Sequence, residues 1–221
     1  MSRKIRTTTI LTSIALVLVI AAMSLSSTKA YSQFMKSYRK LTKPERHWVL
    51  WHPVAAFRTH TLADTAKREA IRRLKDPDLD GDINGGMVDA FKHTLWMALN
   101  AQRISPSKAL SLGEAHEESA KLEFLADPSR KTVGQDSIAS RMDILNNIVG
   151  VDIGSHNPKA SYTEIVSLVK QAVVDGRCWK IKKVGLHKYL DDSNEVINIH
   201  DYDGKWNIPK VLVPSNKSDN K

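Results

Sequence analysis

The sequence contains a single cysteine and lacks the motifs of several common enzyme classes. Because Cys178 has no second cysteine in the 221 residues, no disulfide can form within the chain, and a packed core must stabilise the fold. The sequence has no C-x-x-C metal site, no phosphate-binding glycine loop and no G-x-S-x-G nucleophile elbow. It also lacks the H-E-x-x-H motif, which excludes the familiar helical zinc-protease arrangement.

Basic residues outnumber acidic ones, but they do not form a stripe. Lys and Arg number 33 against 24 Asp and Glu, and four of the basic residues lie in residues 1–30, which contain no acid. The other 29 basic residues (33 less those four) are interleaved with the 24 acids. A nucleic-acid-binding protein usually concentrates its positive charge on one face, so we expect no nucleic-acid partner.

Residues 1–30 have the pattern of a targeting segment. Arg3, Lys4 and Arg6 precede an apolar run over residues 10–23, and small residues follow it. Because the run is shorter than the ~20 residues that a membrane span needs, the pattern favours a secretory signal peptide, with an uncleaved anchor as the alternative. No cysteine lies directly after the run, which excludes a lipoprotein anchor. We therefore expect an exported protein, periplasmic or secreted, or one anchored in the inner membrane and facing the periplasm. Its N-terminus would contact the membrane.

The rest of the chain has the pattern of a helical domain with short flanking segments. Residues 31–53 are basic and aromatic, and we interpret them as a connector, although they could also lie on a membrane surface. A mainly helical domain is expected over residues 54–213, and the polar residues 214–221 are expected to be disordered. The expected helices span residues 54–75, 87–103, 105–127, 136–149 and 161–175.

Local signals mark the ends of these helices. Ser105 precedes a proline at a helix start, Ser161 and Glu164 form a capping box, and Gly150 and Gly176 are expected to end helices. Short strands are then expected over residues 178–184, 196–200 and 206–213, with a hairpin turn at Asp203-Gly204 between the last two. The sequence therefore predicts a mainly α fold, an orthogonal or antiparallel bundle of about five helices with a small C-terminal β-hairpin.

Polar side chains share one face of the second expected helix. Asp89 and His93 are four residues apart, and Trp96 and Asn100 continue the same stripe. Because Met97 lies there too, we expect this face to be covered, although the opposite face is apolar. A covered Asp–His pair fixes the tautomer of the imidazole and raises its basicity.

The third and fourth expected helices carry polar residues that can reach the same place. His116 lies among small or apolar residues, including Gly113, and Glu117 follows it. The short link between the second and third helices makes them antiparallel neighbours, so His116 and His93 could meet. The polar residues on the fourth helix are Asp143, Asn146 and Asn147.

Two chemistries fit this set. In the first, His93 is a general base that Asp89 orients, with His116 or Glu117 as a second acid or base. In the second, the two histidines bind a divalent metal, and carboxylates from Asp89, Glu117 or Asp143 complete the site. The structural alternative is that both histidines are core residues satisfied by local hydrogen bonds.

The loop over residues 76–86 matches the first half of a calcium-binding loop. Acids occupy positions 1, 3 and 5, and Gly81 occupies position 6, as in an EF-hand. Position 12 is Met87, where a bidentate acid is expected. The alternative is an acidic turn that caps the following helix. The candidate calcium ligands are Asp76, Asp78, Asp80, Asp82 and Asn84.

Three motifs follow one another between residues 75 and 155. They are Asp89-Ala90-x-Lys92-His93-x-x-Trp96, Ala115-His116-Glu117 and Asp143-x-x-Asn146-Asn147-x-x-Gly150. This order resembles an uncharacterised bacterial helical domain with the pattern D-A-x-[RK]-H-x-x-W … H-E … D-x-x-N-N-x-x-G, found in exported proteins and at the C-termini of polymorphic toxins. The resemblance implies that His93, His116 and Glu117 matter, and it supplies no reaction.

These features together predict an exported hydrolase or toxin-like enzyme with a pocket between helices. His93 is the expected base and Asp89 its orienting partner. His116 and Glu117 are the expected acid/base groups or metal ligands, and Trp96 is the expected pocket wall. The alternative is a non-enzymatic binding or structural protein of the cell envelope that calcium could stabilise. The substrate is not indicated by the sequence.

Overall fold

The computed structural model describes residues 28–127, 135–186 and 188–218, and its contacts divide the chain into two compact units, residues 1–61 and 62–221. The expected targeting segment lies outside the described residues except for its last three positions. Within the described ranges, no helix is both long enough and apolar enough to cross a membrane.

The first unit is helical where a connector was expected. It contains α2 (Thr28–Lys40), α3 (Lys43–Trp51) and α4 (Pro53–Thr59). Phe34 of α2 and Phe57 of α4 are in ring contact, with 6.0 Å between centroids. Helix α4 belongs to the first unit, and the second unit begins at Leu62.

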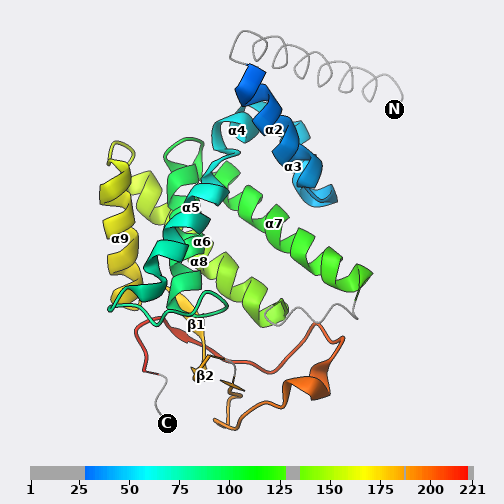
Figure 1. The fold of residues 1–221 in the computed structure, drawn as a ribbon, viewed down its shortest axis with the longest axis vertical. Helices are drawn as coiled ribbons and strands as arrows, with labels where there is room; N and C mark the ends of the chain where they lie inside the picture. The colour runs from blue at the N-terminus through cyan, green and yellow to red at the C-terminus, as the bar shows by residue number, and fades with distance from the viewer. Residues whose placement is uncertain (1–27, 128–134, 187, 219–221) are drawn as a thin grey trace. The chain divides into compact units, whose positions relative to one another are not determined.

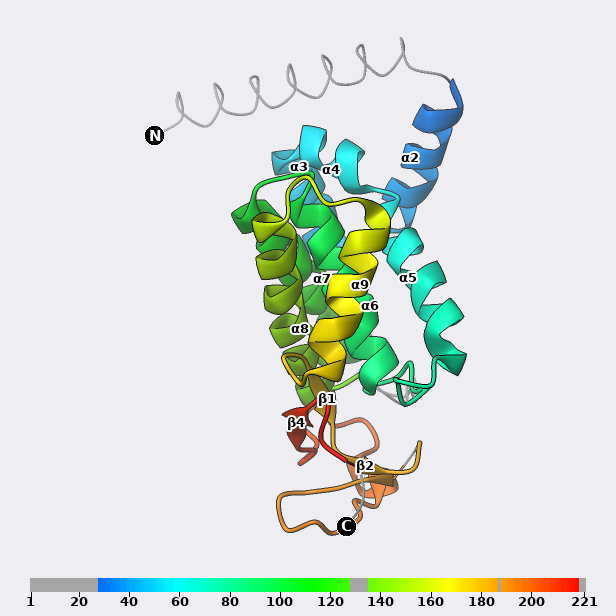
Figure 2. The ribbon, with the colours of Figure 1, turned by 90° about the vertical axis from the view of Figure 1, so that its left-hand side faces the viewer.

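The second unit is built around α6, which is buried on all sides. Val88, Ala90 and Phe91 point in different directions from this helix and are all fully buried, and the polar residues Asp89 and His93 are buried as well. Helices α5, α7, α8 and α9 pack around it (Figures 1 and 2). The bounds are α5 (Leu62–Arg72), η1 (Arg73–Lys75), α6 (Met87–Ala101), α7 (Pro106–Ala126), α8 (Ser137–His156) and α9 (Tyr162–Val174). The mainly helical fold is confirmed.

Helix α8 does not end at Gly150, so that prediction is wrong. Gly150 and Gly154 both lie inside the helix, where they face α6. A Cβ atom on Gly150 would lie 2.2 Å from the carbonyl oxygen of Thr94, and one on Gly154 would lie 2.2 Å from that of Ala98. The glycines therefore allow the two backbones to approach closely, and this contact between α6 and α8 is the most extensive between helices of the unit.

Two small antiparallel sheets follow α9, so a small β-hairpin is present near the C-terminus. Strand β1 (Trp179–Ile181) pairs with β4 (Leu212–Pro214), and β2 (Lys183–Val184) pairs with β3 (Lys188–Tyr189). The hairpin connects β2 and β3 through Gly185, which has φ +67°. This segment lies at one end of the helices (Figure 2).

The strand expected at residues 196–200 and the hairpin at Asp203-Gly204 are wrong. The chain forms a 3-10 helix, η2 (Ile199–Tyr202), because the Asn198 side chain accepts a hydrogen bond from the His200 N–H and so caps it. Gly204 does turn the chain, with φ +75°, but it follows this helix and does not join two strands.

Pro214 and Ser215, the first residues of the expected disordered tail, are part of the folded unit. Pro214 belongs to β4, and Ser215 is fully buried. The Ser215 N–H donates to the carbonyl oxygen of Cys178 at 2.8 Å, and its Oγ donates to that of Val173 at 2.6 Å. These two hydrogen bonds offset the burial of a polar residue, while residues 219–221 lie outside the described chain.

Candidate functional site

Asp89 and His93 of α6 converge with Asp143 of α8 in a buried cluster. His93 Nε2 lies 3.6 Å from Asp89 Oδ1 and 3.3 Å from Asp143 Oδ1. The His93 and Asp89 side chains are 7% and 11% exposed, and that of Asp143 is 16% exposed. Two carboxylates from different helices therefore face the same imidazole nitrogen.

These groups do not satisfy one another by hydrogen bonding. Asp143 Oδ1 and His93 Nδ1 are both buried and without a hydrogen-bond partner. The separation of 3.6 Å between His93 and Asp89 is also longer than a hydrogen bond. Buried polar atoms nearly always have a partner, so a group of unpaired atoms requires an explanation.

The orientation of Asp89 is fixed by the loop before α6. The Gly85 N–H donates to Asp89 Oδ2 at 2.7 Å, and the Gly85 carbonyl oxygen accepts from the Ile181 N–H at 2.8 Å. Gly85 has φ +86°, and a Cβ atom there would lie 2.8 Å from the Ile181 side chain. Only glycine fits this position, and it joins the loop, α6 and β1 at the cluster.

Lys92 is part of the cluster although it was not among the residues expected there. Its Nζ lies 2.5 Å from Asp89 Oδ1. Lys92 lies three residues after Asp89, which places the two side chains on one face of α6. This spacing is the signal in the sequence that indicates Lys92 as a member of the cluster. Lys92 is also a fixed position of the first motif, as the [RK] residue.

Helix α7 brings His116 and Glu117 to the same region, next to Trp96 of α6. The Trp96 ring packs edge-on against both histidines, with centroids 6.4 Å from His93 and 5.2 Å from His116. Glu117 is buried. The two imidazoles therefore contact one tryptophan, but among the described residues the group able to hold a metal is Asp89, His93 and Asp143, without His116.

Gly113 of α7 allows Asn147 of α8 to approach. A Cβ atom on Gly113 would lie 2.8 Å from Asn147 Nδ2. The Asn147 side chain lies beside His93, and both its polar atoms are buried without partners. Gly113 therefore lies where α7 and α8 approach each other.

Burial shifts the titration of the cluster in the direction of neutral groups. It lowers the pKa of His93 well below the ordinary value, and the charge of Lys92 lowers it further. Burial and the neighbouring carboxylates of Asp89 and Glu117 raise the pKa of Asp143 well above its ordinary value. Burial also raises the pKa of Glu117. A neutral imidazole and carboxyl groups that hold protons therefore lie side by side, as in acid–base sites.

Two other predicted pocket residues have structural contacts. Asn146 binds the backbone of Trp179 in both directions, donating to its oxygen at 2.9 Å and accepting from its N–H at 2.8 Å. It therefore ties β1 to α8. Asn100 is fully buried, and its Nδ2 donates to the Trp96 carbonyl oxygen at 2.8 Å.

Lysine side chains bind the oxygens that calcium would use in the acidic loop. Lys170 Nζ lies 2.8 Å from carboxylate oxygens of Asp76 and of Asp78. Lys183 Nζ, which is buried, donates to a carboxylate oxygen of Asp82. Two ammonium groups thus compensate the loop charge that a calcium ion would otherwise neutralise.

The other two predicted calcium ligands also have partners. Asp80 Oδ2 accepts from the N–H of Met87, the first residue of α6, at 2.7 Å. The backbone carbonyl oxygen of Asn84 accepts a hydrogen bond from Lys183 Nζ. The loop thus caps the following helix, and calcium binding, which stays a prediction, would compete with the two lysines.

A comparison with family models identifies the chain's relatives. The model of a domain of unknown function, DUF6973, matches residues 46–177, which is more than half of the 221 residues and includes every member of the cluster. No curated protein and no solved structure gives a significant match. The matched range also contains the three motifs noted in the sequence, and the chain belongs to the DUF6973 family.

Proposed function

We propose that this protein is a hydrolase whose reaction centre is the cluster of Asp89, His93 and Asp143. The observation that carries the proposal is the convergence of His93 Nε2 with one oxygen of each aspartate, while His93 Nδ1 and Asp143 Oδ1 are buried without a hydrogen-bond partner. Elsewhere in the second unit a buried polar side chain such as Asn146 uses both of its polar atoms. Buried polar atoms that lie close together without hydrogen-bond partners are typical of sites that bind a substrate or cofactor.

Hydrolysis requires an activated water molecule and a proton for the leaving group. His93 and Asp89 are the groups proposed to activate water, beside the carboxyl group of Asp143. Glu117, buried on the facing helix, is proposed to supply the proton, and Trp96 to form the wall against which substrate binds. The protein is proposed to act outside the cytoplasm, because residues 1–30 begin with basic residues and continue with an apolar run, as in targeting segments.

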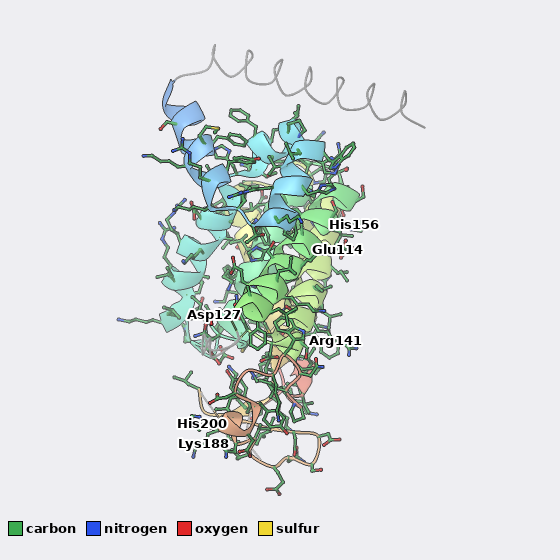
Figure 3. The ribbon with its side chains drawn as sticks, turned by 90° about the vertical axis from the view of Figure 1, so that its right-hand side faces the viewer. Glu114, Asp127, Arg141, His156, Lys188 and His200 are labelled. Carbon is green, nitrogen blue, oxygen red and sulfur yellow. The ribbon has the colours of Figure 1, made fainter. Side chains whose placement is uncertain are left out.

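The test compares two cluster variants with two matched controls. The full chain is assayed against chromogenic carboxylic esters, phosphate monoesters, phosphate diesters and amides. The cluster variants are His93→Gln and Asp143→Asn. The controls are His156→Gln and Asp152→Asn, because these residues form an exposed His–Asp pair on α8, with Nδ1 and Oδ1 3.0 Å apart. His156 lies at the far end of α8 from Arg141 (Figure 3).

We expect one substrate class to be hydrolysed. Each cluster substitution should reduce kcat/KM by about 10²–10⁴-fold, as is usual for loss of an acid–base group, while the controls keep the wild-type rate. Circular dichroism should show folded protein in all four variants. Hydrolysis that survives both cluster substitutions would contradict the proposal. Failure of the wild type on every class would favour the non-enzymatic alternative.

A further inference from the structure

We infer that Asp89, His93 and Asp143 bind a divalent metal ion, with zinc or manganese as the class that the ligands fit. The inference deepens the proposed function and rests on it for its catalytic meaning, but metal binding can be measured by itself. The ligand atoms would be His93 Nε2 and one carboxylate oxygen from each aspartate.

The spacing of the donor atoms fits a metal centre. Ligands at about 2.0–2.2 Å in a tetrahedral arrangement are about 3.4 Å from one another. His93 Nε2 lies 3.6 Å and 3.3 Å from the two carboxylate oxygens, and all three atoms lie within 4.8 Å of one another. The two carboxylate oxygens would need to close by at most about 1.4 Å (4.8 less 3.4), and no hydrogen bond holds Asp143 Oδ1 in its present position.

The charge of the cluster also fits a divalent cation. Three carboxyl groups, those of Asp89, Asp143 and Glu117, lie near the single ammonium group of Lys92, and they would carry three negative charges once a bound ion displaces their protons. A doubly charged ion would neutralise the remaining two. Buried charges in proteins are paired or bind metals.

A buried ion pair elsewhere in the second unit shows the contrast. Lys210 Nζ and Asp136 Oδ2 lie 2.5 Å apart, and both side chains are 1% exposed. That carboxylate has its own cation, whereas three carboxylates share Lys92 in the cluster. The proposed metal site therefore has fewer cations for its acidic groups than this buried ion pair has.

Lys92 would compete with the ion for Asp89 Oδ1. Its side chain is 29% exposed, so its ammonium group can move to solvent while its methylene groups stay packed. Removing this competitor should strengthen metal binding. Lys92→Met is therefore an informative variant.

Asn147 is placed to orient the imidazole. The Asn147 side chain lies beside His93, and both its polar atoms and His93 Nδ1 are buried. A small rotation of the amide would let Nδ1–H donate to Asn147 Oδ1 and leave Nε2 free for the metal. Metal-binding histidines usually donate their other N–H to such a partner.

The identity of the ion follows from the ligand types. One imidazole and two carboxylates suit zinc or manganese. Three protein ligands leave a position open for water, as in catalytic centres. A zinc ion in such a centre lowers the pKa of its bound water to about 7.

The experiment titrates chelator-treated full chain with Zn²⁺ by isothermal titration calorimetry. Co²⁺ is then used as a probe, because its visible absorption reports coordination by the imidazole and carboxylates. We expect one ion per chain. Binding should weaken at least about 100-fold in His93→Gln and in Asp143→Asn, strengthen in Lys92→Met, and remain unchanged in His156→Gln.

Two outcomes would overturn the inference. One is the absence of Zn²⁺ and Co²⁺ binding by folded wild type, and the other is binding that disappears in His156→Gln and persists in Asp143→Asn. The proposed function fails separately. Metal binding without any hydrolysis supports the inference and contradicts the proposed hydrolase function. If the wild type binds no metal and its hydrolysis is undiminished in excess chelator, the metal-binding inference alone is contradicted.

Discussion

Replacing Asp143 by asparagine should stabilise the metal-free protein while it removes the proposed activity. The Asp143 side chain is 16% exposed, and its Oδ1 has no hydrogen-bond donor. Burial and the carboxylates of Asp89 and Glu117 raise the pKa of Asp143 well above 3.8. Asparagine has nearly the same shape and no charge, so it removes the repulsion without leaving a cavity.

The pH dependence has a definite sign. Between 3.8 and the raised pKa of Asp143, the folded protein holds a proton that the unfolded chain has lost. Asp143 therefore contributes its full stabilisation at pH values below its pKa in the unfolded chain. This contribution is lost as the pH rises through its pKa in the folded protein. The variant cannot lose this contribution, so its advantage over the wild type should grow with pH.

The magnitude expected near neutral pH is that of a typical stabilising substitution, about 1 kcal/mol. For a chain of this size it corresponds to a rise of about 2–4 °C in Tm. Thermal unfolding is followed by circular dichroism in excess chelator at pH 5 and pH 8. The control Asp152→Asn, at a side chain that is 49% exposed, should change stability by no more than about 0.5 kcal/mol. An Asp143→Asn variant that is less stable than wild type at both pH values would refute the reasoning.

Three further predictions concern the helices and the charged contacts. Gly154→Ala should destabilise the protein by about 1–3 kcal/mol in urea unfolding, because its Cβ would lie 2.2 Å from the Ala98 carbonyl oxygen; no change would contradict the close contact between α6 and α8. Lys210→Met should lower the free energy of unfolding by about 3–5 kcal/mol, since it leaves the Asp136 carboxylate buried without its cation; a loss below about 1 kcal/mol would count against this ion pair. Asp78→Asn should leave any calcium-induced rise in Tm unchanged, because a lysine ammonium group already binds this carboxylate; a smaller rise in the variant would show that the loop holds calcium.

Helix ends could be predicted wherever a local signal decides them. Ser161 and Glu164 form the expected capping box at the start of α9, and Gly176 follows its end with φ +78°. Gly150 is also a glycine, but it lies inside α8, where it contacts the Thr94 backbone of α6 and does not end the helix. A glycine at a helix end and a glycine at a helix contact look alike until the packing partner is known.

The β segment was less predictable because its main pairing is distant in the sequence. Strand β1 ends at Ile181, and its partner β4 begins at Leu212. Turn signals such as Asp203-Gly204 report only neighbouring segments. They therefore suggested a local hairpin where the chain forms η2.

The site was predictable along one helix and not across helices. The spacing of Asp89 and His93 places them on one face of α6, as expected. The short link to α7 suggested His116 as the main partner, yet the closest carboxylate comes from Asp143, because glycines bring α8 against α6. The lysines that bind the acidic loop also lie about 90 or more residues away, at Lys170 and Lys183, beyond the reach of any local pattern.

The central claim is that the cluster of Asp89, His93 and Asp143 is a ligand-binding centre and not a satisfied core contact. Crystals of the full chain soaked in Zn²⁺ and measured at the zinc absorption edge test it most directly. The account predicts an anomalous peak about 2.0–2.2 Å from His93 Nε2 and from an oxygen of each aspartate. A map without density there, or with a peak only at His156 and Asp152, would contradict it.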